Sequence, residues 1–219
     1  MTYLQVLIFG ISLGGVYALM ASGLTLIFGV MNIVNLAHAA FMLISAYMAL
    51  GLFNAFGIDP ILSVVITMPV LFFFGMLVYK LLFSRIAESS RFVESTVLLT
   101  FAMATVIEGV LSFLFTGIYR STTPAYTTET LHVGALYFPE GQFYATVVSV
   151  VLLVALWIFL RTTRTGYAIR ATMQNRTAAK TVGVDVAKIS LITFGIGTAL
   201  AGASGSLISF IFTFFPARS

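Results

Sequence analysis

Hydrophobic residues in this 219-residue chain form long continuous stretches and do not alternate with polar residues as in a β-barrel. The first charged residue is Asp59, so residues 1–58 carry no charged side chain. At about 1.5 Å per residue, one helix of that length would far exceed a bilayer core of about 30 Å. The stretch must therefore fold back on itself, and helices satisfy its backbone polar groups in lipid. The pattern predicts two membrane-spanning helices before Asp59.

The same pattern continues to the end of the chain and predicts an all-α polytopic membrane helix bundle. The expected spans are about 4–28, 35–53, 60–83, 96–118, 143–160 and 189–215. A polar loop at about 119–142, which contains Pro124 and several tyrosines, is expected to form a small ordered cap. No linker or low-complexity segment interrupts the chain, so we expect one transmembrane domain over 1–219.

Basic residues gather on one side of this topology, although the chain is 60% hydrophobic and only 8% charged. The positive-inside rule makes that side cytoplasmic, including a long loop at about 161–188, and places the N-terminus outside. The other side holds Arg120 and Arg218. The basic side holds Lys80, Arg85, Arg91, Arg161, Arg164, Arg170, Arg176, Lys180 and Lys188. The net charge of +4 therefore indicates topology and not nucleic-acid binding.

Small residues are concentrated in the first and last spans. Gly10 and Gly14 form a GxxxG motif, and Gly202 and Gly205 lie in a similar stretch of the last span. Small side chains let helices approach closely, and such packing is a main attraction between helices in lipid. We expect both glycine pairs to form helix-packing faces.

Four polar residues are candidates for a translocation path. Asn32 and Asn35 suit a turn or a helix cap between the first two spans. His38 either bonds a backbone carbonyl as a buried histidine or lines a polar pathway. Glu108 lies near the middle of the fourth span, where a carboxylate normally faces the bundle interior or a water-filled cavity. A structural role for Glu108 and a role in a pathway or interface both stay open.

Residues 202–205 read Gly-Ala-Ser-Gly, which is similar to the serine motif of rhomboid intramembrane proteases. A serine nucleophile needs a base within hydrogen-bond reach, and both histidines of the chain precede Ser204. We therefore expect no enzyme activity and no catalytic residue. With no cysteine in the chain, we also expect no metal site. A GxxxxGK[ST] motif is absent, so any ATP must be bound by another chain.

The basic loop carries the pattern of a short docking helix. Asn175 can cap a helix over 176–182, and Gly183 can end it. Ala178, Ala179 and Val182 share one face of that helix, whereas Arg176 and Lys180 share another. A small apolar face of this kind fits the groove of a partner protein. The alternative is an amphipathic helix on the membrane surface, but 168–183 contains no Trp, Phe or Leu.

Two long blocks resemble the permeases of bacterial ABC importers for branched-chain amino acids. Residues 166–207, GYAIRATMQNRTAAKTVGVDVAKISLITFGIGTALAGASGSL, resemble the coupling-helix region of that family. Residues 15–47 resemble its N-terminal region, with the family's N-x-A-H-G motif present as Asn35-Leu36-Ala37-His38-Ala39. Ala39 replaces a glycine of the motif. The resemblance covers essentially the whole chain in order.

This resemblance implies a permease subunit of an ATP-driven importer in a bacterial or archaeal cytoplasmic membrane. The implied partners are a second homologous permease, two cytoplasmic ATPase subunits and an extracytoplasmic solute-binding protein, and the chain itself needs no cofactor. The residues that the resemblance implies for coupling to the ATPases are Arg170, Asn175, Arg176, Ala178, Ala179, Lys180 and Gly183.

Family members usually continue through further spans, so the resemblance also predicts a C-terminally truncated chain. Two other functions stay open. One is an ABC permease for urea, amides or another small polar solute. The other is an ion-coupled carrier, for which Glu108 is the best support.

Overall fold

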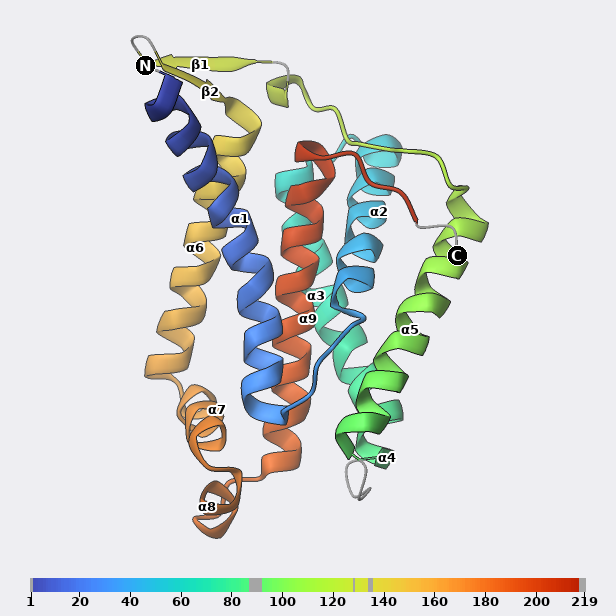
Figure 1. Ribbon diagram of the computed structural model, residues 1–219, viewed down its shortest axis with the longest axis vertical. Helices are drawn as coiled ribbons and strands as arrows, with labels where there is room; N and C mark the ends of the chain where they lie inside the picture. Colours follow the sequence, from blue (N-terminus) through green and yellow to red (C-terminus); the bar gives the residue numbers. More distant parts are fainter. Residues whose placement is uncertain (1, 87–91, 128, 134–135, 217–219) are drawn as a thin grey trace.

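The computed structural model describes residues 2–86, 92–127, 129–133 and 136–216. Six helices in these ranges are long and apolar enough to cross a membrane, which confirms the predicted helix bundle (Figure 1). A π-helical turn, η1 (Tyr79–Phe83), and the short α4 (Ser84–Ile86) continue the third of them. The six helices are α1 (Thr2–Met31), α2 (His38–Phe56), α3 (Pro60–Val78), α5 (Phe92–Phe115), α6 (Glu140–Thr162) and α9 (Val186–Ile211).

Helix α9 forms the centre of the bundle, with α1, α2 and α3 packed around it (Figure 1). In the most apolar 18-residue stretch of α9, 78% is buried inside the protein, compared with 11% in the corresponding stretches of α5 and α6. Glycines allow the close contacts with its neighbours. A Cβ atom on Gly23 of α1 would lie 2.7 Å from the Gly197 carbonyl oxygen, and one on Gly205 would collide with the Met42 carbonyl oxygen of α2. Gly202 packs against Leu71 of α3, so both predicted packing glycines of α9 lie in helix contacts.

The GxxxG pair of α1 does not pack within the described part of the chain. Gly10 and Gly14 are exposed, and a Cβ atom added to either would meet nothing within 4 Å. Gly23 makes the close approach of α1 to α9 instead, and Gly15 packs against Thr146 of α6. The motif alone did not reveal which face of α1 meets the bundle, so the predicted packing role of Gly10 and Gly14 is wrong within this chain.

Three buried hydroxyl groups join α2, α3 and α9 in the core. The Ser206 hydroxyl lies 2.8 Å from that of Ser45 and 2.8 Å from that of Thr67. Ser45 also donates to the Gly202 carbonyl at 2.5 Å. Hydrogen bonds of this kind add directional contacts where apolar packing alone would let helices slide. The three helices therefore form a bonded unit.

An irregular segment, 32–37, climbs from the end of α1 to the start of α2 within the bundle (Figure 1). Thr100, eight residues or about 12 Å into α5, donates to the Val34 carbonyl at 3.3 Å. Ile33, Asn35 and Ala37 are buried, whereas the residues between them are exposed. The first helix therefore continues to Met31, and the second begins at His38 and not at 35 as predicted. Non-helical backbone at membrane depth requires such burial.

The outer loop forms an ordered cap, as predicted. It contains η2 (Ala125–Thr127) and an antiparallel hairpin of β1 (Thr130–Val133) and β2 (Leu136–Pro139). The hydroxyl of Tyr126 donates to Asp59 at the start of α3, at 2.9 Å. Burial raises the pKa of Tyr126, and the hydrogen bond to the Asp59 carboxylate raises it further. The cap is thereby bonded to the membrane domain.

Two short helices project from the opposite end of the bundle (Figure 1). They are α7 (Arg164–Gln174) and α8 (Arg176–Thr181). Of the eleven Lys and Arg residues, Arg91 and Arg218 lie outside the described residues. Of the remaining nine, Arg120 lies on the outer side and eight lie at the α7–α8 end. This distribution supports the predicted assignment of that end to the cytoplasm.

Candidate functional site

Helix α8 has the caps that the sequence predicted. Oδ1 of Asn175 accepts a hydrogen bond from the Ala178 N–H at 2.9 Å. Gly183 has φ of 90°, and its N–H donates to the Lys180 carbonyl at 3.1 Å. Only glycine adopts that φ without steric strain. These bonds stabilise a helix that is too short to be stable in water by its intrinsic helix propensity alone.

The two alanines of α8 have different surroundings. Ala179 is 3% exposed, and its carbonyl accepts from the Val184 N–H at 3.0 Å because the chain reverses at Gly183 and returns over this face. Ala178 is exposed, and Val182 is 79% exposed. The prediction that Ala179 lies against a partner is therefore wrong. The apolar surface open to a partner consists of Ala178 and Val182.

The cations of this region lie in two places. Arg176 and Lys180 line a cavity of about 560 Å³ together with Tyr79 and Asp185. Arg170 lies over the Tyr167 ring, with its guanidinium carbon 5.0 Å from the ring centre. The open apolar pair on α8 is thus bordered by basic side chains, a surface suited to a partner groove with acidic edges.

Asn32 and Asn35 both act as turn residues, as predicted. Asn32 ends α1 with φ of 53° and is exposed. Asn35 is 3% exposed, and its Oδ1 accepts from the Ala37 N–H at 3.2 Å, just before α2. Its side-chain amide nitrogen is buried with no partner among the described residues.

His38 is a buried histidine bonded to a backbone carbonyl, one of its two predicted roles. Nε2 lies 3.1 Å from the Met20 carbonyl oxygen, about 16 Å along α1 from its end at Met31. Because a carbonyl only accepts, Nε2 carries the hydrogen and Nδ1 is left as an acceptor. Nδ1 is also buried without a described partner. The irregular segment and the first residue of α2 thus carry one donor and one acceptor that have no partner among the described residues.

Glu108 is half-buried on α5 and forms no hydrogen bond or ion pair with any described residue. It lies one helical turn from the buried Leu111, at the border of the face that α5 turns towards α2. No described contact joins it to Asn35 or His38. The four predicted path residues therefore do not form one continuous group.

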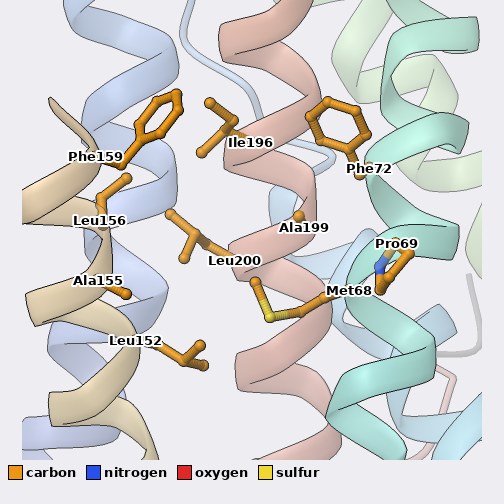
Figure 2. Close-up of a pocket in the computed structure, with 10 residues that line it drawn as sticks. All are labelled: Met68, Pro69, Phe72, Leu152, Ala155, Leu156, Phe159, Ile196, Ala199 and Leu200. Carbon is orange, nitrogen blue, oxygen red and sulfur yellow. The ribbon is translucent and has the colours of Figure 1, made fainter. Parts of the chain in front are cut away.

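An apolar groove with a volume of about 350 Å³ lies between α3, α6 and α9 (Figure 2). Its walls contain no charged side chain, so it offers nothing to bind the charged groups of a polar solute. The lining residues are Met68, Pro69, Phe72, Leu152, Ala155, Leu156, Phe159, Ile196, Ala199 and Leu200.

Ser204 of the Gly-Ala-Ser-Gly sequence is fully buried in α9. Its hydroxyl donates to the Leu200 and Ala201 carbonyls, each at 3.0 Å. Both acceptors belong to its own helix. This arrangement is typical of a serine in a membrane helix and leaves the hydroxyl without the base that a nucleophile needs.

A polar cluster that the sequence did not single out lies midway along α2. Tyr47 is 3% exposed and its hydroxyl has no described partner. The Tyr47 ring stacks on Phe115 at 4.3 Å and meets Phe214 edge-on at 5.0 Å. Arg120 bonds to the backbone of both phenylalanines. In the sequence, this cluster was indicated only by Arg120, which lies on the outer side, where basic residues are few.

The comparisons with known proteins agree with the architecture. A model of the family described as "Branched-chain amino acid transport system / permease component" matches residues 6–219. A probable branched-chain amino acid transport permease protein LivH of Methanocaldococcus jannaschii is 33% identical over 205 residues, which cover 91% of this chain and 64% of that protein.

Two bacterial relatives are more distant. The high-affinity branched-chain amino acid transport system permease proteins LivH of Escherichia coli and BraD of Pseudomonas aeruginosa are each 25% identical, over 94% of this chain and 70% of their own length. No solved structure matches the chain.

The chain thus spans about two-thirds of the length of these curated relatives. Its six apolar helices and its relatives make it a multi-pass protein of the cytoplasmic membrane. By the match over residues 6–219, it belongs to the family of permease components of branched-chain amino acid transport systems.

Proposed function

We propose that this chain acts as the permease subunit of an ATP-driven importer for branched-chain amino acids. The names of the archaeal and bacterial relatives support the substrate class. The implied assembly contains a second homologous permease, two cytoplasmic ATPase subunits and an extracytoplasmic solute-binding protein. ATP is bound by the ATPase chains, and this chain makes or breaks no covalent bond.

The observation that carries this proposal is the capped helix α8 at the basic end of the bundle. Its exposed Ala178 and Val182 form a small apolar surface, and Asn175 and Gly183 fix both of its ends. A short rigid helix of this kind passes the movement of a bound partner on to the bundle, whereas a flexible loop would change its own conformation instead. Closure of the ATPase dimer would therefore move α8 and, through α7, the cytoplasmic end of the bundle.

The bundle has a suitable centre for such a movement. Ser45, Thr67 and Ser206 bond α2 and α3 to α9, so these three helices move together. Helices α5 and α6 contact the centre over little of their surface. Rocking of the bonded unit against its neighbours would alternate access to the two sides of the membrane.

The test is substrate-stimulated ATP hydrolysis and leucine uptake by the assembled transporter in proteoliposomes. Val182→Glu should lower both by about tenfold or more, because it places a charge in an apolar interface. Ser84→Glu is the matched control, since Ser84 is exposed at the same end of the bundle but lies on α4, away from α8 (Figure 1). It should leave both activities near the wild-type level.

Two results would contradict the proposal. Unchanged stimulation in Val182→Glu would remove α8 as the coupling element. Failure of the assembled wild-type transporter to accumulate leucine, isoleucine or valine would remove the substrate class.

A further inference from the structure

Two buried donors near Phe115 and Phe214 have no acceptor among the described residues. The Tyr47 hydroxyl and Nε of Arg120 are both buried and have no described hydrogen-bond partner. Both residues contact Phe115 and Phe214, since the Tyr47 ring packs on the two phenylalanine rings and Arg120 bonds to their backbone. A buried polar group without a partner costs about 1–3 kcal/mol, so two side by side need an explanation.

Two backbone segments hold Arg120 in place. Its N–H donates to the Phe214 carbonyl at 2.9 Å, and its own carbonyl accepts from the Phe214 N–H at 2.8 Å. Nη2 donates to the Phe115 carbonyl at 3.1 Å. This bond uses one of the five N–H donors of the guanidinium group. Of the remaining donors, Nε is buried and has no partner among the described residues.

An apolar cavity of about 160 Å³ adjoins this cluster. Phe214, which contacts the Tyr47 ring, also lines the cavity, and Ala46 of the cavity wall precedes Tyr47 in the chain. The rest of its wall is aliphatic and comes from α2 and α9, including Met42, Leu43 and Ile208. An apolar cavity of about 150 Å³ is large enough to hold a benzene-sized group. A branched aliphatic side chain therefore fits.

We infer that Arg120 and Tyr47 bind the carboxylate of an aliphatic amino acid on the outer side of the permease, with its side chain in the adjoining cavity. A guanidinium fork and a phenol are donors suited to a carboxylate, and such charge-assisted bonds are among the strongest in proteins. Arg120 is the one cation of the outer side among the described residues. The inference rests on the proposed function and assigns residues to its substrate.

The site is closed in this structure, since Tyr47 is 3% exposed. Phe115 and Phe214, which cover its ring, belong to or follow the ends of α5 and α9. The backbone pairing of Arg120 with Phe214 connects the segments that follow α5 and α9. Separation of the two segments would admit the ligand.

The test is equilibrium binding of radiolabelled L-leucine to the purified permease in lipid nanodiscs, without the solute-binding protein and ATPases. Unlabelled 4-methylpentanoate, which keeps the carboxylate, should compete, whereas leucinamide, which lacks it, should not. Arg120→Gln should weaken binding about tenfold or more, and Arg120→Lys less, because lysine keeps the charge but not the fork.

Tyr47→Phe is the decisive variant. It removes only the unpartnered hydroxyl and keeps the ring contacts, so the unfolding midpoint should not fall. Leucine binding should nevertheless weaken about two- to tenfold, as for the loss of one hydrogen bond. Arg161→Gln, at the opposite end of the molecule, is the control and should bind leucine like the wild type.

Two results would overturn the inference. One is wild-type binding in folded Arg120→Gln and Tyr47→Phe variants, which would leave buried water as the partner of these donors. The other is the absence of saturable leucine binding to the wild-type permease. Leucine uptake by the assembled transporter would still support the proposed function in both cases, so the two failures are distinguishable.

Discussion

At the scale of single residues, Tyr126 shows how one side chain fixes a loop. Its hydroxyl donates to Asp59 at 2.9 Å, and its ring meets Phe210 of α9 and Tyr144 of α6 edge-on, each at 5.6 Å. The same Asp59 carboxylate accepts from the Ile61 N–H at 2.8 Å and so caps α3. One carboxylate therefore serves both a helix start and the outer cap.

We predict that Tyr126→Phe loosens the outer cap without unfolding the bundle. Loss of a hydrogen bond to a charged group costs about 1.5–3 kcal/mol, and hydrogen exchange of 119–139 should accelerate accordingly. Tyr119→Phe, at a side chain that is 63% exposed, is the matched control and should exchange like the wild type. Equal exchange in both variants would show that Tyr126 does not hold the cap.

The Tyr126 contribution should not vary with pH over the neutral range. Its pKa is raised in the folded state, so the phenol is protonated there and in the unfolded chain below about pH 10. The stabilisation is fully present below that pH and is lost as the pH rises through the folded-state pKa. Accelerated exchange of the cap between pH 6 and 8 would therefore need another cause.

At the scale of elements, the close contact of α1 with α9 depends on glycine at two facing positions. A Cβ atom on Gly197 would lie 2.8 Å from the Gly23 carbonyl oxygen, and the reverse distance for Gly23 is 2.7 Å. Backbone atoms cannot move aside to make room for a Cβ atom, as the end of a flexible side chain can. The two helices would have to move apart to admit even one methyl group.

We predict that Gly23→Ala destabilises the permease by about 1–3 kcal/mol, as for overpacking of a tight core. Gly14→Ala, on the exposed side of the same helix, should be neutral or slightly stabilising for the isolated chain, since alanine favours helix. Reversible unfolding in mixed detergent micelles measures both. Equal stability of the two variants would contradict the structure of the α1–α9 contact.

At the scale of the whole molecule, charge distribution fixes orientation. Eight of the nine described Lys and Arg residues lie at the α7–α8 end, and Arg120 lies at the other. This asymmetry places α8 in the cytoplasm and the hairpin of β1 and β2 outside. A coupling role for α8 and a ligand site at Arg120 both depend on that orientation.

We predict that a cysteine at Lys180 reacts with a membrane-impermeant maleimide only after the cells are permeabilised, whereas one at Tyr119 reacts in intact cells. The chain contains no native cysteine, so each variant carries a single reporter. Both side chains are exposed, so accessibility is not limited by burial. Labelling of the Lys180 position in intact cells would invert the topology.

The sequence by itself determined the six spans, the basic side and the capped helix α8. Each of these is encoded in consecutive residues: continuous hydrophobicity, the placement of Lys and Arg, and the Asn175 and Gly183 pair. Such signals act locally or along the membrane normal, so they can be read without knowing which helices are neighbours.

Only the tertiary structure decided which faces meet. It buried Ala179 and left Val182 open, exposed Gly10 and Gly14, and started α2 at membrane depth. It also brought Tyr47 and Arg120, 73 positions apart in the chain, beside the same two phenylalanine residues. Contacts between distant segments depend on the rotation of each helix about its axis, and in a chain that is apolar on nearly all sides hydrophobic periodicity does not fix that rotation.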